Sequence, residues 1–146
     1  MAIQFHTDTR DDIMAAILAA LDGGAGAALI AIYSGTIRAT VETALSGNTL
    51  LAKLVCADPA GAVASGVLTF DFDPDITDAA ADATGTATWF RMYSSADGST
   101  ISEANAILQG TVTATGGGGD MTFTSTSFVS GEPITLTTGT LTAPGA

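Results

Sequence analysis

Basic residues are scarce in this chain of 146 residues. Four Lys and Arg residues, of which Lys53 is the single lysine, stand against fifteen Asp and Glu residues, so the formal net charge is −11. A protein that binds nucleic acid through its phosphates needs a positively charged surface. The composition therefore excludes an ordinary nucleic-acid-binding surface, and we expect no nucleic-acid partner.

Residue types that carry catalysis or bind metals are also rare. The chain has one cysteine, Cys56, and one histidine, His6. A single cysteine excludes an internal disulfide and a zinc site built from several thiolates. A catalytic Ser-His-Asp or Cys-His arrangement would have to recruit His6 from far away in the sequence, and Cys56 lies in an apolar run that is typical of a buried strand. We therefore expect no enzyme.

Long apolar runs are absent as well. No stretch approaches the roughly 20 apolar residues that span a membrane, so we expect no membrane partner. The apolar run 13–21 is preceded by Asp8, Asp11 and Asp12, whereas a signal peptide has basic residues at that place. We expect a protein that is made in the cytoplasm of its host cell and stays soluble or joins an assembly.

The chain is rich in apolar and β-branched residues. Hydrophobic residues make up 47% of the sequence, which excludes intrinsic disorder, and 23 residues are threonine, which is favoured on half-exposed strand surfaces. The length fits one domain of ordinary size. Residues 1–24 are predicted to form an N-terminal arm and a helix, and residues 25–146 a β domain.

The predicted helix follows the arm. Thr7 or Asp8 can cap its start, and Gly23-Gly24 can end it. An apolar stripe with helical spacing runs along it, at Met14, Ile17, Leu18 and Leu21.

Short segments with alternating polarity and turn signals fill the rest of the chain. We predict strands over residues 28–33, 36–43, 49–57, 67–72, 84–93, 106–115, 121–129 and 134–141. Turn signals every 8–12 residues, without crossover helices, are typical of a sandwich or barrel. The predicted fold is mainly β, an antiparallel, jelly-roll-like β-sandwich with one N-terminal α-helix.

The densest polar cluster follows the strand predicted at 67–72. Asp71, Asp73, Asp75 and Asp82 occupy positions 1, 3, 5 and 12 of a calcium loop, but position 6 is Ile76 instead of the glycine that the turn needs. This excludes an EF-hand. It leaves open a looser Ca²⁺ site that includes Asp71, Asp73 and Asp75, or a cation shared between subunits, while a solvated acidic loop is the favoured interpretation. We expect no other cofactor.

Three further segments have structural interpretations. Neither Gly24-Ala25-Gly26 nor the run 116–119 has the context of a phosphate-binding loop, so both are predicted to be turns. Residues 89–93 are the heaviest stretch in a chain with few aromatic residues and are predicted to form a central strand. Within it, Arg91 must either pair with an acid or emerge at an edge or a subunit contact.

Several segments together resemble a known family. They are Met1–Phe5 before the helix, Ile32–Thr36, Thr49–Ala52, Phe90–Tyr93 and, most specifically, the run Gln109–Thr122. The chain resembles small structural proteins encoded by tailed bacteriophages, most strongly from about residue 83 to residue 141. The resemblance is weakest over residues 56–82.

The resemblance implies a virion component without enzymatic activity. The first expectation is a capsid decoration, or cement, protein on the outer surface of the head, with the major capsid protein and further copies of itself as partners and a trimer as the favoured oligomer. The alternatives are a tail, baseplate or adaptor component, and a head-fibre or carbohydrate-binding module. The candidate contact residues are Ile3, Phe5 and His6 in the arm, Met14, Leu18 and Leu21 on the helix, and Arg91. For the helix stripe, packing on the chain's own sandwich is the favoured alternative.

Overall fold

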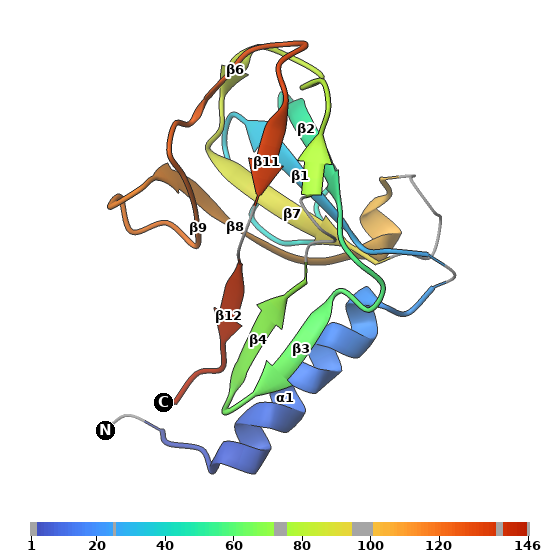
Figure 1. The fold of residues 1–146 in the computed structure, drawn as a ribbon, viewed down its shortest axis with the longest axis vertical. Coiled ribbons are helices and arrows are strands. Elements are labelled where there is room, and N and C mark those ends of the chain that lie inside the picture. The colour runs from blue at the N-terminus through green and yellow to red at the C-terminus, as the bar shows by residue number, and fades with distance from the viewer. Residues whose placement is uncertain (1–2, 25, 72–75, 95–100, 137–138, 146) are drawn as a thin grey trace.

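One helix packs against a mainly β body in the computed structural model (Figure 1). The structure describes residues 3–24, 26–71, 76–94, 101–136 and 139–145. The strands form a curled central sheet and several small sheets around it. The prediction of a mainly β, sandwich-like fold with one N-terminal helix is confirmed.

The central sheet has five strands. In spatial order they are β2 (Thr49–Val55), β1 (Leu29–Ser34), β7 (Trp89–Tyr93), β8 (Ala106–Ala114) and β9 (Met121–Phe123). Neighbours are antiparallel except β8 and β9, which pair in parallel. A loop of only six residues joins these two parallel strands, so the chain folds back on itself there.

Seven short strands form the smaller sheets. A three-stranded sheet has the order β12 (Thr140–Thr142), β4 (Val67–Phe70), β3 (Gly61–Ala64), and two pairs join β10 (Ser127–Phe128) with β6 (Gly85–Thr86) and β11 (Ile134–Leu136) with β5 (Ile76–Asp78). The strands predicted at 84–93, 121–129 and 134–141 are each divided between two sheets. The sequence pattern does not mark where the first sheet ends and the second begins within these segments.

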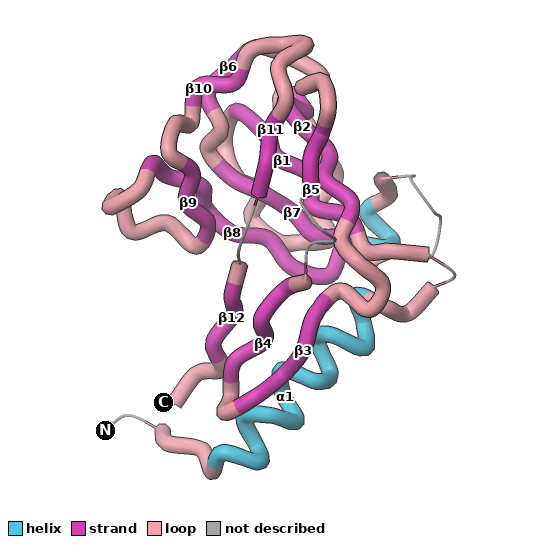
Figure 2. The backbone as a smooth tube through the Cα atoms, viewed as in Figure 1, coloured by secondary structure: helices cyan, strands magenta, loops and turns pink. Residues whose placement is uncertain are grey.

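The helix α1 (Thr7–Leu21) lies along the three-stranded sheet (Figure 2). Its N-cap is His6, whose Nδ1 accepts a hydrogen bond from Asp8 N at 3.3 Å, and not the predicted Thr7 or Asp8. The helix presents Met14 and Leu21 to the body, where both are buried. One packed body thus includes the helix and both groups of sheets.

Strand β7 is buried on both of its faces. Phe90 and Met92 belong to the main core, whereas Trp89 and Tyr93 belong to a second core on the opposite face of the sheet. The segment 35–48 covers this second core. The prediction of a weak strand over residues 36–43 is wrong. This segment forms bends and turns that pack on the side chains of the second core.

Candidate functional site

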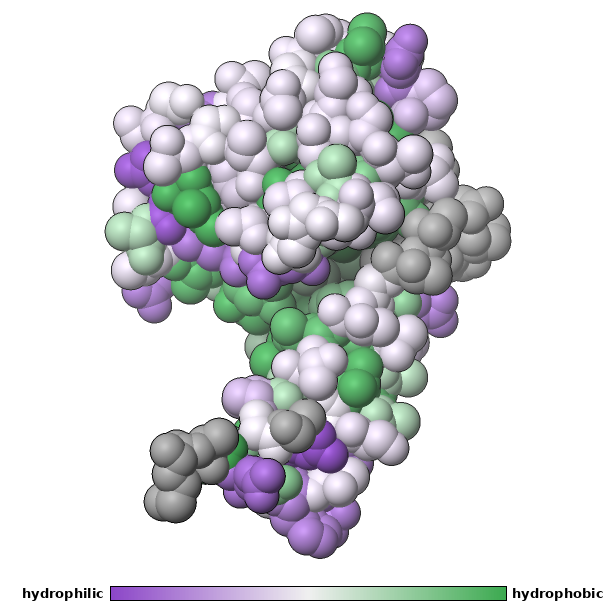
Figure 3. All heavy atoms as spheres, turned by 90° about the vertical axis from the view of Figure 1, so that its left-hand side faces the viewer, coloured by the Kyte–Doolittle hydropathy of each residue, from purple (hydrophilic) through white to green (hydrophobic). Residues whose placement is uncertain are grey.

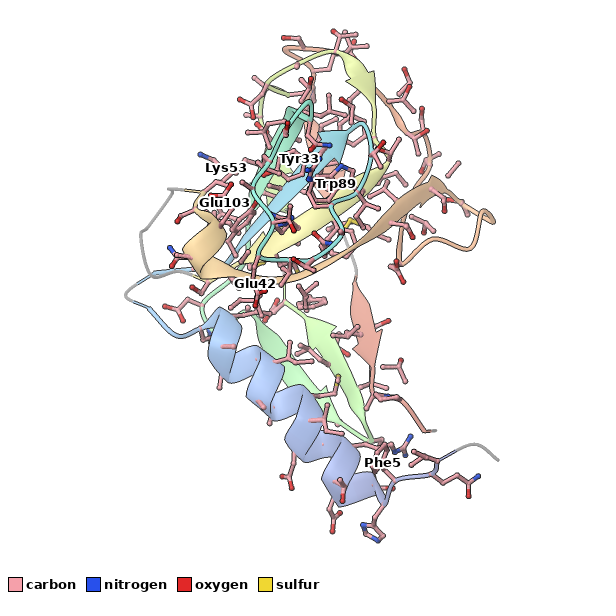
Figure 4. The ribbon with its side chains drawn as sticks, turned by 180° about the vertical axis from the view of Figure 1, so that it is seen from behind. Phe5, Tyr33, Glu42, Lys53, Trp89 and Glu103 are labelled. Carbon is pink, nitrogen blue, oxygen red and sulfur yellow. The ribbon has the colours of Figure 1, made fainter. Side chains whose placement is uncertain are left out.

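The segment before α1 carries exposed apolar side chains. Ile3 is 72% exposed and Phe5 39% exposed, and among the described residues only Val55 and Val129 are other large hydrophobic residues with comparable exposure. Phe5 N donates to Gly145 O at 3.5 Å, so the segment lies beside the end of the chain (Figure 4). The predicted contact residues Ile3, Phe5 and His6 therefore lie together on the surface.

The helix stripe faces inward. Met14 packs with Leu68 and Ala143, and Leu21 joins the main core. Leu18 is half-buried between these two clusters. In this chain the stripe therefore stabilises its own fold, and Met14 and Leu21 offer no surface for a partner.

Arg91 is also buried, with no exposed surface. Its guanidinium donates to Gln109 Oε1 at 2.8 and 3.2 Å and to the carbonyl oxygens of Thr43 at 3.2 Å and Thr40 at 3.4 Å. The group lies 5.2 Å from the centre of the Trp89 ring. In the part of the chain that the structure describes, no carboxylate comes within ion-pair distance of it. Arg91 thus neither pairs with an acid nor emerges at the surface, and instead holds the covering segment 35–48 on the sheet.

Two of the aromatic rings near Arg91 stack on each other. The centroids of the Tyr33 and Trp89 rings lie 4.6 Å apart (Figure 4). The Tyr33 and Tyr93 hydroxyl oxygens are 2.9 Å apart and share a hydrogen bond. Burial raises the pKa of both tyrosine hydroxyls well above the ordinary value. All three rings are buried, so they cannot stack on a sugar at the surface.

The two residues considered for nucleophilic catalysis lie at opposite ends of α1. His6 caps the start of the helix, whereas Cys56 lies near Asp22, just after its end. A helix of fifteen residues is about 22 Å long. Burial raises the pKa of the Cys56 thiol to about 12, which keeps it protonated and unreactive at neutral pH.

The candidate Ca²⁺ ligands are only partly described. Asp71 is exposed at the end of β4, while Asp73 and Asp75 lie outside the described residues. Among the residues that the structure describes, no three His, Cys, Asp or Glu side chains gather as a metal site. Within the same ranges, no helix has the length and apolar character that a membrane crossing requires.

The most specific part of the phage resemblance, Gln109–Thr122, forms a folded unit. Asp120 Oδ2 accepts hydrogen bonds from Thr111 N and Thr111 Oγ1, both at 2.8 Å, and Gly119 N donates to Thr113 Oγ1 at 3.0 Å. A Cβ on Gly110 would lie 2.7 Å from the Phe90 ring and 2.9 Å from Asp120. The glycines and threonines of this run thus allow the loop to fold back over β8 and start β9 parallel to it.

We expect Asp120→Ala to lower the free energy of unfolding by about 1 kcal/mol at pH 7, because it leaves Thr111 N without its acceptor at a solvent-exposed site. The bonds from Thr111 hold the Asp120 pKa below its usual value. The carboxylate therefore stabilises the fold fully above about pH 4, and this stabilisation is lost as the pH falls through the lower folded-state pKa. Urea denaturation at pH 7 and pH 3 measures the difference. Glu42→Ala, which removes an exposed acid elsewhere, is the control, and an equal effect of both variants would contradict the role of Asp120.

A groove of about 390 Å³ lies between the central sheet and β12. Its apolar lining includes Phe70, Leu108, Met121, Phe123, Leu136 and Leu141. Figure 3 shows the molecule indented at this level, with hydrophobic side chains visible in the indentation. A shallower hollow of about 260 Å³ shares Phe123, Thr124 and Thr135 with the groove. The groove can bury an apolar segment of another molecule.

Sequence reasoning missed this groove. Its residues come from seven strands and the segments between them, and the alternation in each strand shows only that one face is apolar. Whether that face is fully covered depends on how the sheets sit against each other. In the part of the chain that the structure describes, the exposed segment Ile3–His6 and the groove are both suited to contact another molecule.

Comparison of the chain with models of protein families, with curated proteins and with solved structures finds no match.

Proposed function

We propose that this chain is a structural protein of a bacteriophage virion that decorates the outer surface of the head. It binds the lattice of the major capsid protein, associates with further copies of itself, as a trimer in the favoured arrangement, and has no enzymatic activity. Decoration adds buried area across the joints between capsid subunits and so opposes the outward pressure of packaged DNA. Binding to the assembled lattice stabilises it by mass action and multivalency.

The observation that carries the proposal is the exposed segment Ile3–His6. Apolar side chains as exposed as Ile3 and Phe5, next to each other on one segment, gain free energy when a neighbouring subunit covers them. The segment precedes α1 at the surface of a β body whose aromatic residues Trp89, Tyr33 and Tyr93 are all buried. This pattern suits a subunit that attaches to its neighbours better than a module that binds sugars through surface aromatics.

The net charge of the chain supports a location on the outer surface of the head. With a formal net charge of −11, the chain is repelled by DNA phosphates. Several acids are at the surface, among them Asp8 and Asp12 on α1 and Asp71 after β4. A location on the outside of the particle keeps these carboxylates in water and away from the packaged genome.

Copy number in the purified virion tests the proposal. A decoration of the head lattice is expected in hundreds of copies, because each lattice position offers a site. Quantitative mass spectrometry of virions of the phage that encodes this sequence, normalised to the major capsid protein, gives the ratio. A few dozen copies or fewer would contradict head decoration and favour a tail, baseplate or adaptor component, and absence from the virion would contradict both.

A further inference from the structure

We propose that the groove between β9 and β12 receives the Ile3–Phe5 segment of a second copy of this chain. This inference rests on the proposed function and deepens it, because it names the neighbour that the exposed segment contacts. It follows from the lining of the groove, from the ends of the sheets beside it, and from the position of the segment in its own chain.

The groove lies where two sheets end. Among the described strands, β9 is the last strand of the central sheet, and β12 is the last strand of the three-stranded sheet. Both contribute lining residues, Met121 and Phe123 on one side and Thr140 and Leu141 on the other. Terminal strands of sheets pair readily with an added extended segment, which gains main-chain hydrogen bonds and places alternate side chains in pockets.

The segment Ile3–His6 has the pattern that such a site needs. Ile3 and Phe5 are two residues apart, so both side chains point to the same face when the segment is extended, and Gln4 points to the other face. The apolar floor of the groove, which includes Leu108 and Phe90, matches the apolar face of the segment. Gln4 would remain in water.

The segment does not line the groove of its own chain. His6 is fixed as the N-cap of α1, and three further residues reach at most about 10 Å. Within the chain the segment lies beside Gly145, beyond the far end of β12, whereas the groove lies between the start of β12 and β9 (Figure 1). The proposal therefore assigns the segment in the groove to a second copy.

A single contact of this kind is small. A segment of three residues buries much less than the roughly 1,200 Å² of a stable interface. The segment and the groove are different surfaces, so the contact is head-to-tail, and it gains strength when a closed ring forms or when a lattice holds the copies side by side. We therefore expect weak association in dilute solution and a contact that matters on an assembled surface.

Disulfide trapping between two variants of the whole chain tests the contact. Ile3→Cys and Met121→Cys are purified separately, mixed at high concentration and oxidised mildly, and the heterodimer is quantified on non-reducing gels and by mass spectrometry. Cys56 gives little background, because it is buried and its pKa is raised to about 12. We expect several-fold more heterodimer than with the control pair Ile3→Cys and Val129→Cys, since Val129 is 43% exposed and outside the groove.

Equal yields from the two pairs would overturn the proposal. So would the double variant Ile3→Cys/Met121→Cys if it closed its disulfide within one chain. Adding Phe5→Ala to the Ile3→Cys chain is expected to lower the yield, while Gln4→Ala is expected to leave it unchanged, and equal effects of both would also overturn the proposal. Trp89 fluorescence verifies that each variant is folded. The assay contains no virion, so its failure is distinct from a low copy number in the particle.

Discussion

Replacing Arg91 by alanine is expected to lower the free energy of unfolding by about 3–5 kcal/mol, because several buried acceptors lose their donor and the missing side chain leaves a cavity. The substitution leaves Gln109 Oε1 and the carbonyl oxygens of Thr40 and Thr43 without their donor under the covering segment. It also opens a cavity against the Trp89 ring. Urea denaturation followed by the fluorescence of Trp89, the single tryptophan, measures the loss.

Three control variants separate the causes. Arg91→Met keeps most of the volume but removes all donors, so it isolates the hydrogen bonds from the cavity. Arg91→Lys keeps the charge but cannot donate to Gln109, Thr40 and Thr43 at once, so we expect it to be nearly as unstable as Arg91→Met. In the double variant Arg91→Met/Gln109→Leu, the charge and its main acceptor are both gone, and part of the stability should return. A loss below about 1 kcal/mol for Arg91→Ala would contradict this role of the network.

Arg91 shows which structural features the sequence can predict and which it cannot. The alternation of residues 89–93 predicts a central strand with Trp89, Arg91 and Tyr93 on one face, and the structure has this arrangement. Arg91 donates to Gln109 Oε1 on the neighbouring strand β8 and to main-chain carbonyl groups of a segment about 50 residues away in the sequence. A carbonyl group is present at every residue, so no residue type marks these main-chain acceptors. Among the described residues, Arg91 neither pairs with an acid nor emerges at the surface, which were the alternatives that the sequence left open.

Strand β3 shows a second limit. Residues 61–64 are short and rich in small side chains, so their pattern predicts nothing, yet they pair with β4 beside α1. Gly61 packs so tightly that a Cβ would lie 2.3 Å from Thr69 O. The small side chain is needed because the two backbones approach each other, and this contact becomes visible only in the folded chain.

The exposed segment and the groove also differ in how well the sequence predicts them. The exposed segment could be predicted because Ile3 and Phe5 precede a helix start and lack the pattern of a strand with partners. The groove could not, because three predicted strands each divide between two sheets and their ends form its walls. Local alternation determines which face of a strand is apolar, whereas the position of the sheets determines whether that face is covered.

Replacing Ile3 by aspartate is expected to weaken binding to the particle about tenfold to a hundredfold, while the free energy of unfolding changes little. A buried isoleucine contributes roughly 1.5–3 kcal/mol, and each 1.4 kcal/mol changes an equilibrium constant tenfold. The carboxylate also loses its hydration if it is forced into an apolar site. Titration of undecorated heads with purified protein, followed by sedimentation and quantification of the bound fraction, measures the affinity.

Val129→Asp is the matched control, because it introduces the same charge at an apolar residue that is 43% exposed and far from Ile3 in the sequence. Equal binding of both variants and the wild type would contradict a role for the segment in assembly. The shape of the titration separates two partners for the segment. If it binds a second copy, the wild type should bind heads cooperatively and Ile3→Asp should lose that cooperativity. If it binds the capsid protein directly, each copy attaches independently of its neighbours, so the binding curve is not cooperative. Ile3→Asp should then shift this curve to higher protein concentration.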